Sequence, residues 1–270
     1  MSEITFGQYY PAKSVLHRAD ARAKLFMTFL MIVFLFVCKN FVSLAVMTLV
    51  TVVAVLISGV PIKSILKSIR PVLVILVFTA ILNILYTKGG DVYFEWWKIS
   101  ITQKGVFTAI FTIIRILVLV VISSLLTYTT TPTDLTTGLE RLLSPLNLLH
   151  VKVHTLAMMM TLALRFIPTL IEEIERIMNA QKARGADLET GNLIQRAKAL
   201  IPIFVPLMVS SFRRAYELAF AMTCRCYTGG EGRTRMKQMK LGARDFACLA
   251  VCIVSCAGVI VLNKFLGTVI

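Results

Sequence analysis

Residues 106–126 read VFTAIFTIIRILVLVVISSLL, and this stretch decides the fold class. Apart from Arg115 it carries no charged side chain, and its length matches the roughly 20 mostly apolar residues that a helix needs to cross a bilayer. The 270-residue chain is 57% hydrophobic and has a mean hydropathy of +0.79, whereas soluble domains are about 45–50% apolar. We therefore predict an all-α integral membrane protein.

Four more apolar runs accompany this one, which makes five predicted spans. They are residues 25–37, 41–60, 71–86 and 246–262. The runs 25–37 and 71–86 are short for a span unless flanking residues join the helix. We expect the first run to remain in the protein, because no small-x-small cleavage site follows it and further spans come after.

Lysine and arginine predict the orientation of the chain in the membrane. The net charge is +15, with 29 basic residues. With the N-terminus inside, 23 of the 29 fall in residues 1–24, 61–70 and 128–245, as the positive-inside rule requires. We predict a multi-pass protein of the cell membrane: a membrane part of about four spans at 1–127, a cytoplasmic coupling-helix region at 128–245 and a final transmembrane helix at 246–270.

The region 128–245 holds 16 basic and 10 acidic residues, so it lacks the basic face of a nucleic-acid binder. Two long helices are predicted in it, from about 155 to 184 and from about 193 to 227. Both carry apolar residues at alternating steps of four and three, the spacing of a helix that packs along another helix. These are Leu156, Met160, Ala163, Ile167, Leu170, Ile174 and Ile177 in the first helix, and Ala197, Ile201, Phe204, Met208, Ser211, Ala215, Leu218 and Met222 in the second.

Each long helix ends with an arginine beside a turn: Arg184 precedes Gly185, and Arg225 precedes Cys226. A cation in the last turn interacts with the helix dipole by about 0.3–1 kcal/mol, and a following glycine often closes the helix. Taken singly, either arginine is most simply a helix cap. The pair on matched helices also suits docking, because a guanidinium forms a bidentate fork with a carboxylate in a partner's groove.

Three long motifs resemble one family of membrane proteins. The run LALRFIPTLIEEIERIMNAQKARGADLETGNLIQRAKALIPIFVPLMVSSFRRAYELAFAMTCRCYTGGEGRTR, residues 162–235, resembles EcfT, the transmembrane T component of energy-coupling factor transporters. The resemblance extends to TPTDLTTGLERLLSPLN at 131–147 and to GQYYPAKSVLHRADARAKL at 7–25. The last of these is similar to the shared-module type, which serves several vitamin-binding S components.

The resemblance implies a non-catalytic subunit of an ATP-driven importer. Proteins of this family hold an S component that carries the substrate. They also dock two Ala-Arg-Gly motifs, at the tips of two coupling helices, into grooves on a pair of ABC-type ATPases, here expected to be a heterodimer. Carried over residue by residue, the first motif is Ala183, Arg184 and Gly185.

The second motif departs from the family pattern. Only Arg225 matches, because Cys224 and Cys226 stand where alanine and glycine are usual. The cation remains, but the turn has lost its glycine. We therefore expect the second tip to end differently and to rely on Gly229 and Gly230.

Apolar residues on the two long helices are assigned to packing between the helices or against the S component. They are Met160, Ile167, Ile174, Phe204, Met208 and Met222. Methionine suits a surface that repacks, although any single one of these is equally an ordinary core residue. Arg115 lies in mid-span, where a charge costs about 2.5–3.5 kcal/mol on insertion, so we expect it to face protein, in a structural pair or a functional role.

Neither a metal ion nor a cofactor is expected. The candidate ligands are Cys224 and Cys226, His150 and His154, and Cys248, Cys252 and Cys256 on one face of the last span. Structural zinc needs four ligands, and the histidine pair lacks the glutamate of His-Glu-x-x-His. The three cysteines of the last span are better explained as small side chains on a close-packing face.

The absence of catalytic motifs limits what this chain does alone. No glycine is followed by lysine, so there is no Walker A loop, and we expect ATP hydrolysis to come from partner subunits. The rival hypothesis is a stand-alone secondary transporter or another polytopic membrane protein without ATPase partners. A secondary transporter places ionisable or unwound segments at mid-membrane, whereas these spans are nearly bare apart from Arg115 and Asn83.

Overall fold

The computed structural model describes residues 9–12, 14–87, 92–96, 99–145, 152–186, 192–227, 229 and 242–265. The chain divides into two units. Met1–Leu142 and Lys237–Ile270 form the first, and Leu143–Met236 forms the second.

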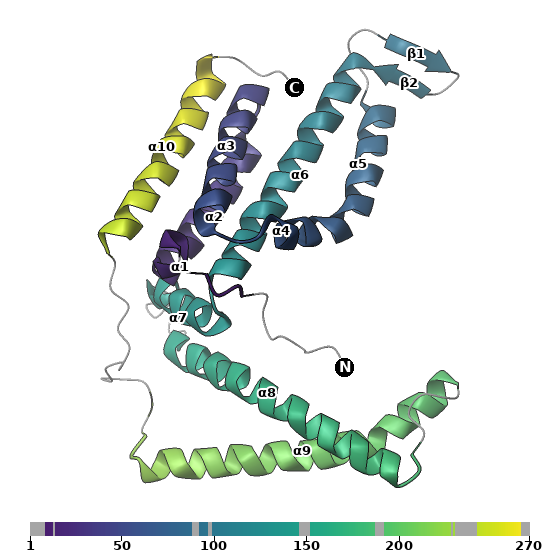
Figure 1. Ribbon diagram of the computed structural model, residues 1–270, viewed down its shortest axis with the longest axis vertical. Helices are drawn as coiled ribbons and strands as arrows, with labels where there is room; N and C mark the ends of the chain where they lie inside the picture. Colours follow the sequence, from purple (N-terminus) through teal and green to yellow (C-terminus); the bar gives the residue numbers. More distant parts are fainter. Residues whose placement is uncertain are drawn as a thin grey trace. The chain divides into compact units, whose positions relative to one another are not determined.

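The first unit is a bundle of helices with one short hairpin. Its elements are α1 (Val15–Arg18), α2 (Ala21–Val37), α3 (Phe41–Ser58), α4 (Ile62–Ile69), the 3₁₀ turn η1 (Arg70–Val72), α5 (Leu73–Tyr86), β1 (Val92–Trp96), β2 (Ile99–Thr102), α6 (Gln103–Thr129), α7 (Pro132–Leu142) and α10 (Ala243–Phe265). In Figure 1 the axes of the long helices α2, α3, α5, α6 and α10 are roughly aligned, whereas α4 lies across them at one end of the bundle.

The core of this unit forms where α2, α3, α6 and α10 meet. Its buried side chains are Leu35, Cys38, Leu44, Met47, Phe111, Val118, Ile122 and Val259. On the outer faces, large apolar side chains such as Phe29, Leu49, Leu56 and Val74 are 65–76% exposed. Apolar residues both inside and outside the bundle are expected of helices that are solvated by lipid.

The predicted helical membrane fold is confirmed. Among the described residues, five helices are long and apolar enough to cross a membrane. Four of them contain predicted spans: α3, α6, α10 and the segment Ile62–Tyr86, in which the predicted span 71–86 corresponds to α5 and the turn before it, while α4 lies across the bundle (Figure 1). The fifth predicted span lies in α2, which has 17 residues, the lower limit for crossing a bilayer.

The fifth helix of sufficient length and apolarity is α8 (Val153–Ala183) of the second unit, which we predicted outside the membrane. Arg165 is the only lysine, arginine, aspartate or glutamate in its first half, and acidic residues begin at Glu172. The helix is therefore apolar in one half and charged in the other. The apolar residues of the first half were predicted to pack along another helix, and this half also has the apolarity of a span.

A short antiparallel hairpin joins α5 to α6. Its strands β1 and β2 pair Phe94 with Ile101 and Trp96 with Ile99, at the end of the bundle away from α4 (Figure 1). This hairpin departs from the all-helical prediction. The sequence feature that indicates the hairpin is the pair of runs at 92–96 and 99–102, which are rich in the β-branched and aromatic residues that favour strands.

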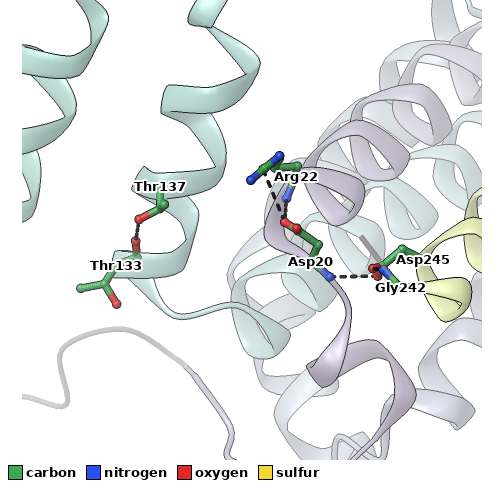
Figure 2. Close-up of polar contacts among 6 residues, drawn as sticks. All are labelled: Asp20, Arg22, Thr133, Thr137, Gly242 and Asp245. Atoms are coloured by element: carbon green, nitrogen blue, oxygen red, sulfur yellow. Dashed lines mark hydrogen bonds and ion pairs between the residues drawn. The ribbon is translucent and has the colours of Figure 1, made fainter. Parts of the chain in front are cut away.

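One buried carboxylate joins the first and last long helices of the bundle. Asp245, in the first turn of α10, accepts a hydrogen bond from the backbone N–H of Gly242 at 2.8 Å, which caps α10. Its other oxygen accepts from the N–H of Asp20 at 2.9 Å. Asp20 in turn caps α2 by accepting from the N–H of Arg22 (Figure 2).

Lys24 ties the same end of α2 to α1 and α6. Its buried ammonium donates to the carbonyl of His17 at 3.2 Å and to that of Thr129 at 2.9 Å. Beside it α7 packs closely on α2: a Cβ added to Gly138 would lie 3.1 Å from the Cβ of Ala21. The structure thus groups α7 with the bundle, although its residues lie in the region 128–245 of the sequence.

Small side chains bring α10 close to α2. Cys252 and Cys256 are buried, and the Cys252 sulfur lies 3.9 Å from the carbonyl oxygen of Met27. Two of the three cysteines predicted to form a packing face are thus buried, whereas Cys248 is half-buried.

The second unit is built on α8 and α9 (Leu193–Cys224). Both contain proline, at Pro168 in α8 and at Pro202 and Pro206 in α9. The two helices cross, as Figure 1 shows.

We predict that Asp245→Ala lowers the free energy of unfolding by about 1–3 kcal/mol, because it leaves two partly buried N–H groups, those of Asp20 and Gly242, without their acceptor. Unfolding by SDS in mixed micelles measures the change. The matched control is Asn263→Ala at the opposite end of α10, where the Asn263 amide donates to the Val37 carbonyl at 2.9 Å and accepts from the Lys39 N–H at 3.4 Å, both at exposed positions where water replaces a lost partner. This control should lose only about 0.5–1.5 kcal/mol. Equal losses in the two variants would contradict the assignment of Asp245.

Candidate functional site

The end of α8 is a glycine-closed turn. Arg184 is the C-cap, and Gly185 follows with a φ of +85°. The N–H of Gly185 donates to the Lys182 carbonyl at 3.0 Å, and the N–H of Ala186 donates to the Gln181 carbonyl at 3.0 Å. These two bonds form the Schellman motif, in which the backbone itself satisfies the last carbonyls of the helix.

The end of α9 has the same geometry. The N–H of Cys226 donates to the Thr223 carbonyl at 2.9 Å, and the N–H of Tyr227 donates to the Met222 carbonyl at 3.0 Å. Cys226 has a φ of +55° and takes the place that Gly185 takes in α8.

The expectation that the second tip ends differently is therefore wrong. Its turn is at Cys226 and does not need Gly229, which lies further along the chain; Gly230 is outside the described residues. A left-handed residue that is not glycine costs about 1–2 kcal/mol. The two hydrogen bonds of the turn offset that cost, which the loss of a glycine in the sequence did not reveal.

The side chains at both tips are exposed. They are those of Ala183, Arg184, Cys224, Arg225 and Cys226. No hydrogen bond or ion pair of either guanidinium is found within the described part of the chain. Because the backbone turn already satisfies the last carbonyls, neither arginine is held as a hydrogen-bonding cap, and each can form a fork with an external carboxylate.

The two tips lie at opposite ends of the helix pair. Near the end of α8, Gln181 donates to the Pro202 carbonyl at 3.3 Å; near its beginning, the Tyr227 hydroxyl donates to the Met158 sulfur at 2.9 Å. The helices therefore run antiparallel. From Pro202 to Arg225, α9 rises roughly 35 Å at 1.5 Å per residue, so the tips suit two separate partner sites.

The contact between α8 and α9 is only half-buried. Glu173 and Arg214 form an ion pair of 2.8 Å across it, with 18% and 36% of their side chains exposed. At that exposure such a pair contributes about 1 kcal/mol or less. Of the described residues in the two helices, the fully buried apolar ones are Val153, Ala157 and Ile203.

The packing face of α9 differs from the predicted spacing. It passes through Ile203, which is 6% exposed, whereas Phe204 is 61% exposed. Apolar side chains lie on several sides of this segment, so spacing alone does not select the buried one. Among the predicted packing residues, Ile167, Ile174 and Met222 are half-buried, and Met160, Phe204 and Met208 are exposed.

An exposed apolar ridge runs along α9. It consists of Phe204, Met208, Phe212, Tyr216 and Phe220, at steps of four residues, and is 44–76% exposed. Each step of four turns by about 40°, so the five side chains follow a stripe that covers a broad side of the helix, an arc of about 160° centred on Phe212. Aromatic residues so placed are typical of surfaces that bind a protein or a membrane. Of these residues, Phe204 and Met208 were among the predicted packing residues, whereas the three aromatic residues that follow were not predicted.

Arg115 is held inside the bundle of the first unit. Its guanidinium donates to the Cys38 carbonyl at 2.6 Å and lies 4.6 Å from the centroid of the Phe111 ring. Cys38 is the C-cap of α2, so the cation also faces the negative end of that helix. The structural role that we considered for Arg115 is thus observed, with a carbonyl in place of an acidic mate.

A polar cavity of about 260 Å³ lies where α1, α2 and the α6–α7 connection meet. Its lining includes His17, Lys24 and Asp134. Burial lowers the pKa of His17 below its usual value. The lining mixes acids and bases, so its charge selects neither a cation nor an anion.

The candidate metal ligands do not come together. Within the part of the chain that the structure describes, no group of three or more His, Cys, Asp or Glu side chains is arranged to hold a metal ion. Cys224 and Cys226 are exposed, His154 lies in α8, and His150 is outside the described residues.

Comparison with known proteins places these features in a family. Residues 12–236 match the family model described as cobalt transport protein, CbiQ. The chain is 48% identical to the energy-coupling factor transporter transmembrane protein EcfT of Ruminiclostridium cellulolyticum, over 97% of each chain. It is 50% identical to EcfT of Brevibacillus brevis, over 91% of this chain and 92% of that protein. EcfT of Bacillus subtilis is 41% identical, over 95% of this chain and 97% of that one.

We predict opposite effects at the two equivalent turn positions. Gly185→Ala should destabilise the end of α8 by about 1 kcal/mol, because only its φ opposes a side chain and nothing lies within 4 Å of an added Cβ. Cys226→Gly should stabilise the end of α9 by a similar amount. Hydrogen exchange at the amides of Ala186 and Tyr227 reports each tip separately. Slower exchange in Gly185→Ala, or faster exchange in Cys226→Gly, would refute the shared geometry.

Proposed function

The chain belongs to the family of EcfT, the transmembrane protein of energy-coupling factor transporters, and we propose that it couples two ATP-hydrolysing partner subunits to a substrate-binding S component of a vitamin importer. One observation carries the proposal. Two helices end in the same backbone turn, and each presents an exposed arginine, Arg184 or Arg225, at an opposite end of one helix pair.

The chemistry of the tips supports docking to acidic grooves. A guanidinium with no intramolecular bond loses no internal contact when a carboxylate binds it, and the fork geometry fixes its direction. Two tips roughly 35 Å apart along α9 match a pair of ATPases better than a single site. Because the sequence has no Walker A loop, we infer that the partners, as a heterodimer, supply ATP hydrolysis and that this subunit is non-catalytic.

The apolar ridge of α9 supports a second docking surface, for the S component. Five side chains from Phe204 to Phe220 are exposed on one side of a helix that also ends at Arg225. A partner on this ridge is therefore attached to the same helix as the second tip. We infer that movement of the tip moves the S component, and that a shared module of this kind serves several S components.

The contact between α8 and α9 supports a sliding mechanism. It has one half-exposed ion pair, Glu173 with Arg214, and few fully buried side chains among the described residues. Half-buried methionines, such as Met158 and Met222, fill such a contact without fixing one arrangement. We infer that closure of the ATPases shifts α8 against α9 and reorients the S component. The N-terminus and both tips then face the cytoplasm.

We predict that Arg184→Glu and Arg225→Glu each weaken ATPase binding at least about 30-fold, because breaking a buried charge pair from one side costs about 2–5 kcal/mol. Copurification and ATP-driven vitamin uptake in reconstituted vesicles measure the effect. The matched controls are Arg176→Glu on α8 and Arg213→Glu on α9, both exposed and away from the tips. Normal assembly and uptake in the double tip variant would reject the coupling role and favour a stand-alone transporter.

The ridge gives a separate prediction. Phe212→Asp should weaken S-component binding at least about 30-fold, since a buried aromatic anchor contributes about 2 kcal/mol or more, and should leave ATPase binding intact. Ala221→Asp is the control, because Ala221 is exposed and lies on the opposite side of α9 by helical phase. If Phe212→Asp spares the S component, the ridge has another partner.

A further inference from the structure

The short helix α4 differs in direction from every span around it. It lies across the long helices of the bundle, at the end where α2 begins and α6 ends (Figure 1). The turn before it is Gly59, with a φ of +68°, and the turn after it is η1, which contains Pro71. If the long helices cross a bilayer, α4 lies in the plane of its surface.

The exposed side of α4 has two adjoining stripes. At 100° per residue, Ile62 and Leu66 lie next to each other, and they are 63% and 58% exposed. Lys63, Lys67 and Arg70 follow on the neighbouring side, and all three are exposed. A helix with an apolar stripe beside a cationic one is typical of helices that lie in a membrane interface.

The opposite side of α4 is fixed to the bundle. Ile65 is 6% exposed and packs with Val60 and Tyr128. The hydroxyl of Tyr128 donates to the Ser64 carbonyl at 3.0 Å and forms a hydrogen bond of 2.8 Å with the Ser68 hydroxyl. These contacts determine which side of α4 faces outward, so the two stripes do not result from a freely rotating segment.

The apolar surface continues from α4 into the next span. Leu73, Val74 and Ile75 at the start of α5 are 49–76% exposed, so the outward surface of this corner has the composition of a lipid-facing wall. The three cations lie at the edge of that wall, on the side predicted to be cytoplasmic. Phosphates of anionic lipids occupy this level of a bilayer, and that leaflet attracts juxtamembrane lysine and arginine.

We propose that α4 is an interfacial helix that binds anionic phospholipid. Ile62 and Leu66 enter the acyl region, and Lys63, Lys67 and Arg70 contact the phosphate groups. Each such cation strengthens attraction to an anionic surface by roughly fivefold, so the three together give this corner a preference for anionic over zwitterionic lipid. The site does not depend on docking of the ATPases or the S component.

The test uses the full-length protein in phosphatidylcholine vesicles that contain spin-labelled phosphatidylglycerol or phosphatidylcholine. The immobilised fraction of each label gives the relative association constant. Wild type should prefer phosphatidylglycerol, and Lys63→Gln/Lys67→Gln/Arg70→Gln should reduce that preference at least about threefold. The control, Lys39→Gln/Lys104→Gln/Lys264→Gln, makes the same charge change at exposed positions at the other end of the helices and should keep the preference.

Wild type provides a second measurement that needs no substitution. Raising NaCl from about 0.1 M to about 1 M shortens the Debye length from about 10 Å to about 3 Å and should remove most of the preference. An unchanged preference in the α4 variant, an equal loss in the control, or a preference insensitive to salt would overturn the proposal. So would loss of an acidic protein partner from the α4 variant without a change in lipid preference.

Discussion

The backbone groups at the ends of α2 determine how the bundle is held together. A helix leaves N–H groups unpaired at its start and carbonyls unpaired at its end, and burial makes each of them costly. At the start of α2, Asp20 and Asp245 supply the acceptors. At its end, Arg115 donates to the Cys38 carbonyl, and Asn263 donates to the Val37 carbonyl. Apart from Asp20, which caps α2 from its own N-cap position, these side chains come from α6 and α10, so capping also joins the helices.

The same requirement is met differently at the ends of α8 and α9. There the chain reverses into a left-handed turn, and its own N–H groups bond the last carbonyls. No side chain is needed for capping, so Arg184 and Arg225 are left without an internal partner among the described residues. Arg115 and Arg184 each lie beside the end of a helix: Arg115 extends from the middle of α6 to the end of α2, and Arg184 is at the end of α8. They differ in whether the backbone already satisfies the helix end: at the end of α2 the Arg115 side chain bonds a carbonyl, whereas at the end of α8 the turn does so and leaves Arg184 exposed.

Much of the fold follows from patterns that repeat along the sequence. Apolar runs of sufficient length located the spans in α3, α5, α6 and α10, and Gly185 located the end of α8. Features without a repeating pattern were missed. The hairpin is too short for periodicity, and the buried face of α9 at Ile203 is surrounded by other apolar residues.

The second tip shows a further limit of sequence patterns. The turn at Cys226 depends on two backbone hydrogen bonds rather than on residue type. A missing glycine therefore misled the prediction for the end of α9. Arg115 could be placed in mid-span from the sequence, but its carbonyl partner came from a helix that only the fold brings near.

The antiparallel crossing of α8 and α9 has a mechanical consequence. Each helix is stiff along its axis. Among the described residues, the contact between the two helices holds few buried side chains and one weak ion pair, so the helices can move against each other more easily than either can change its length. Partners that bind the tips at Arg184 and Arg225 and then approach each other cannot shorten either helix. Because each tip lies beside the other helix, at the Gln181–Pro202 contact and at the Tyr227–Met158 contact, such forces would act along the helix pair and slide one helix against the other. Opposed forces at the two tips would thus become a displacement along the helix pair, and a subunit seated on the side of α9 would move with it.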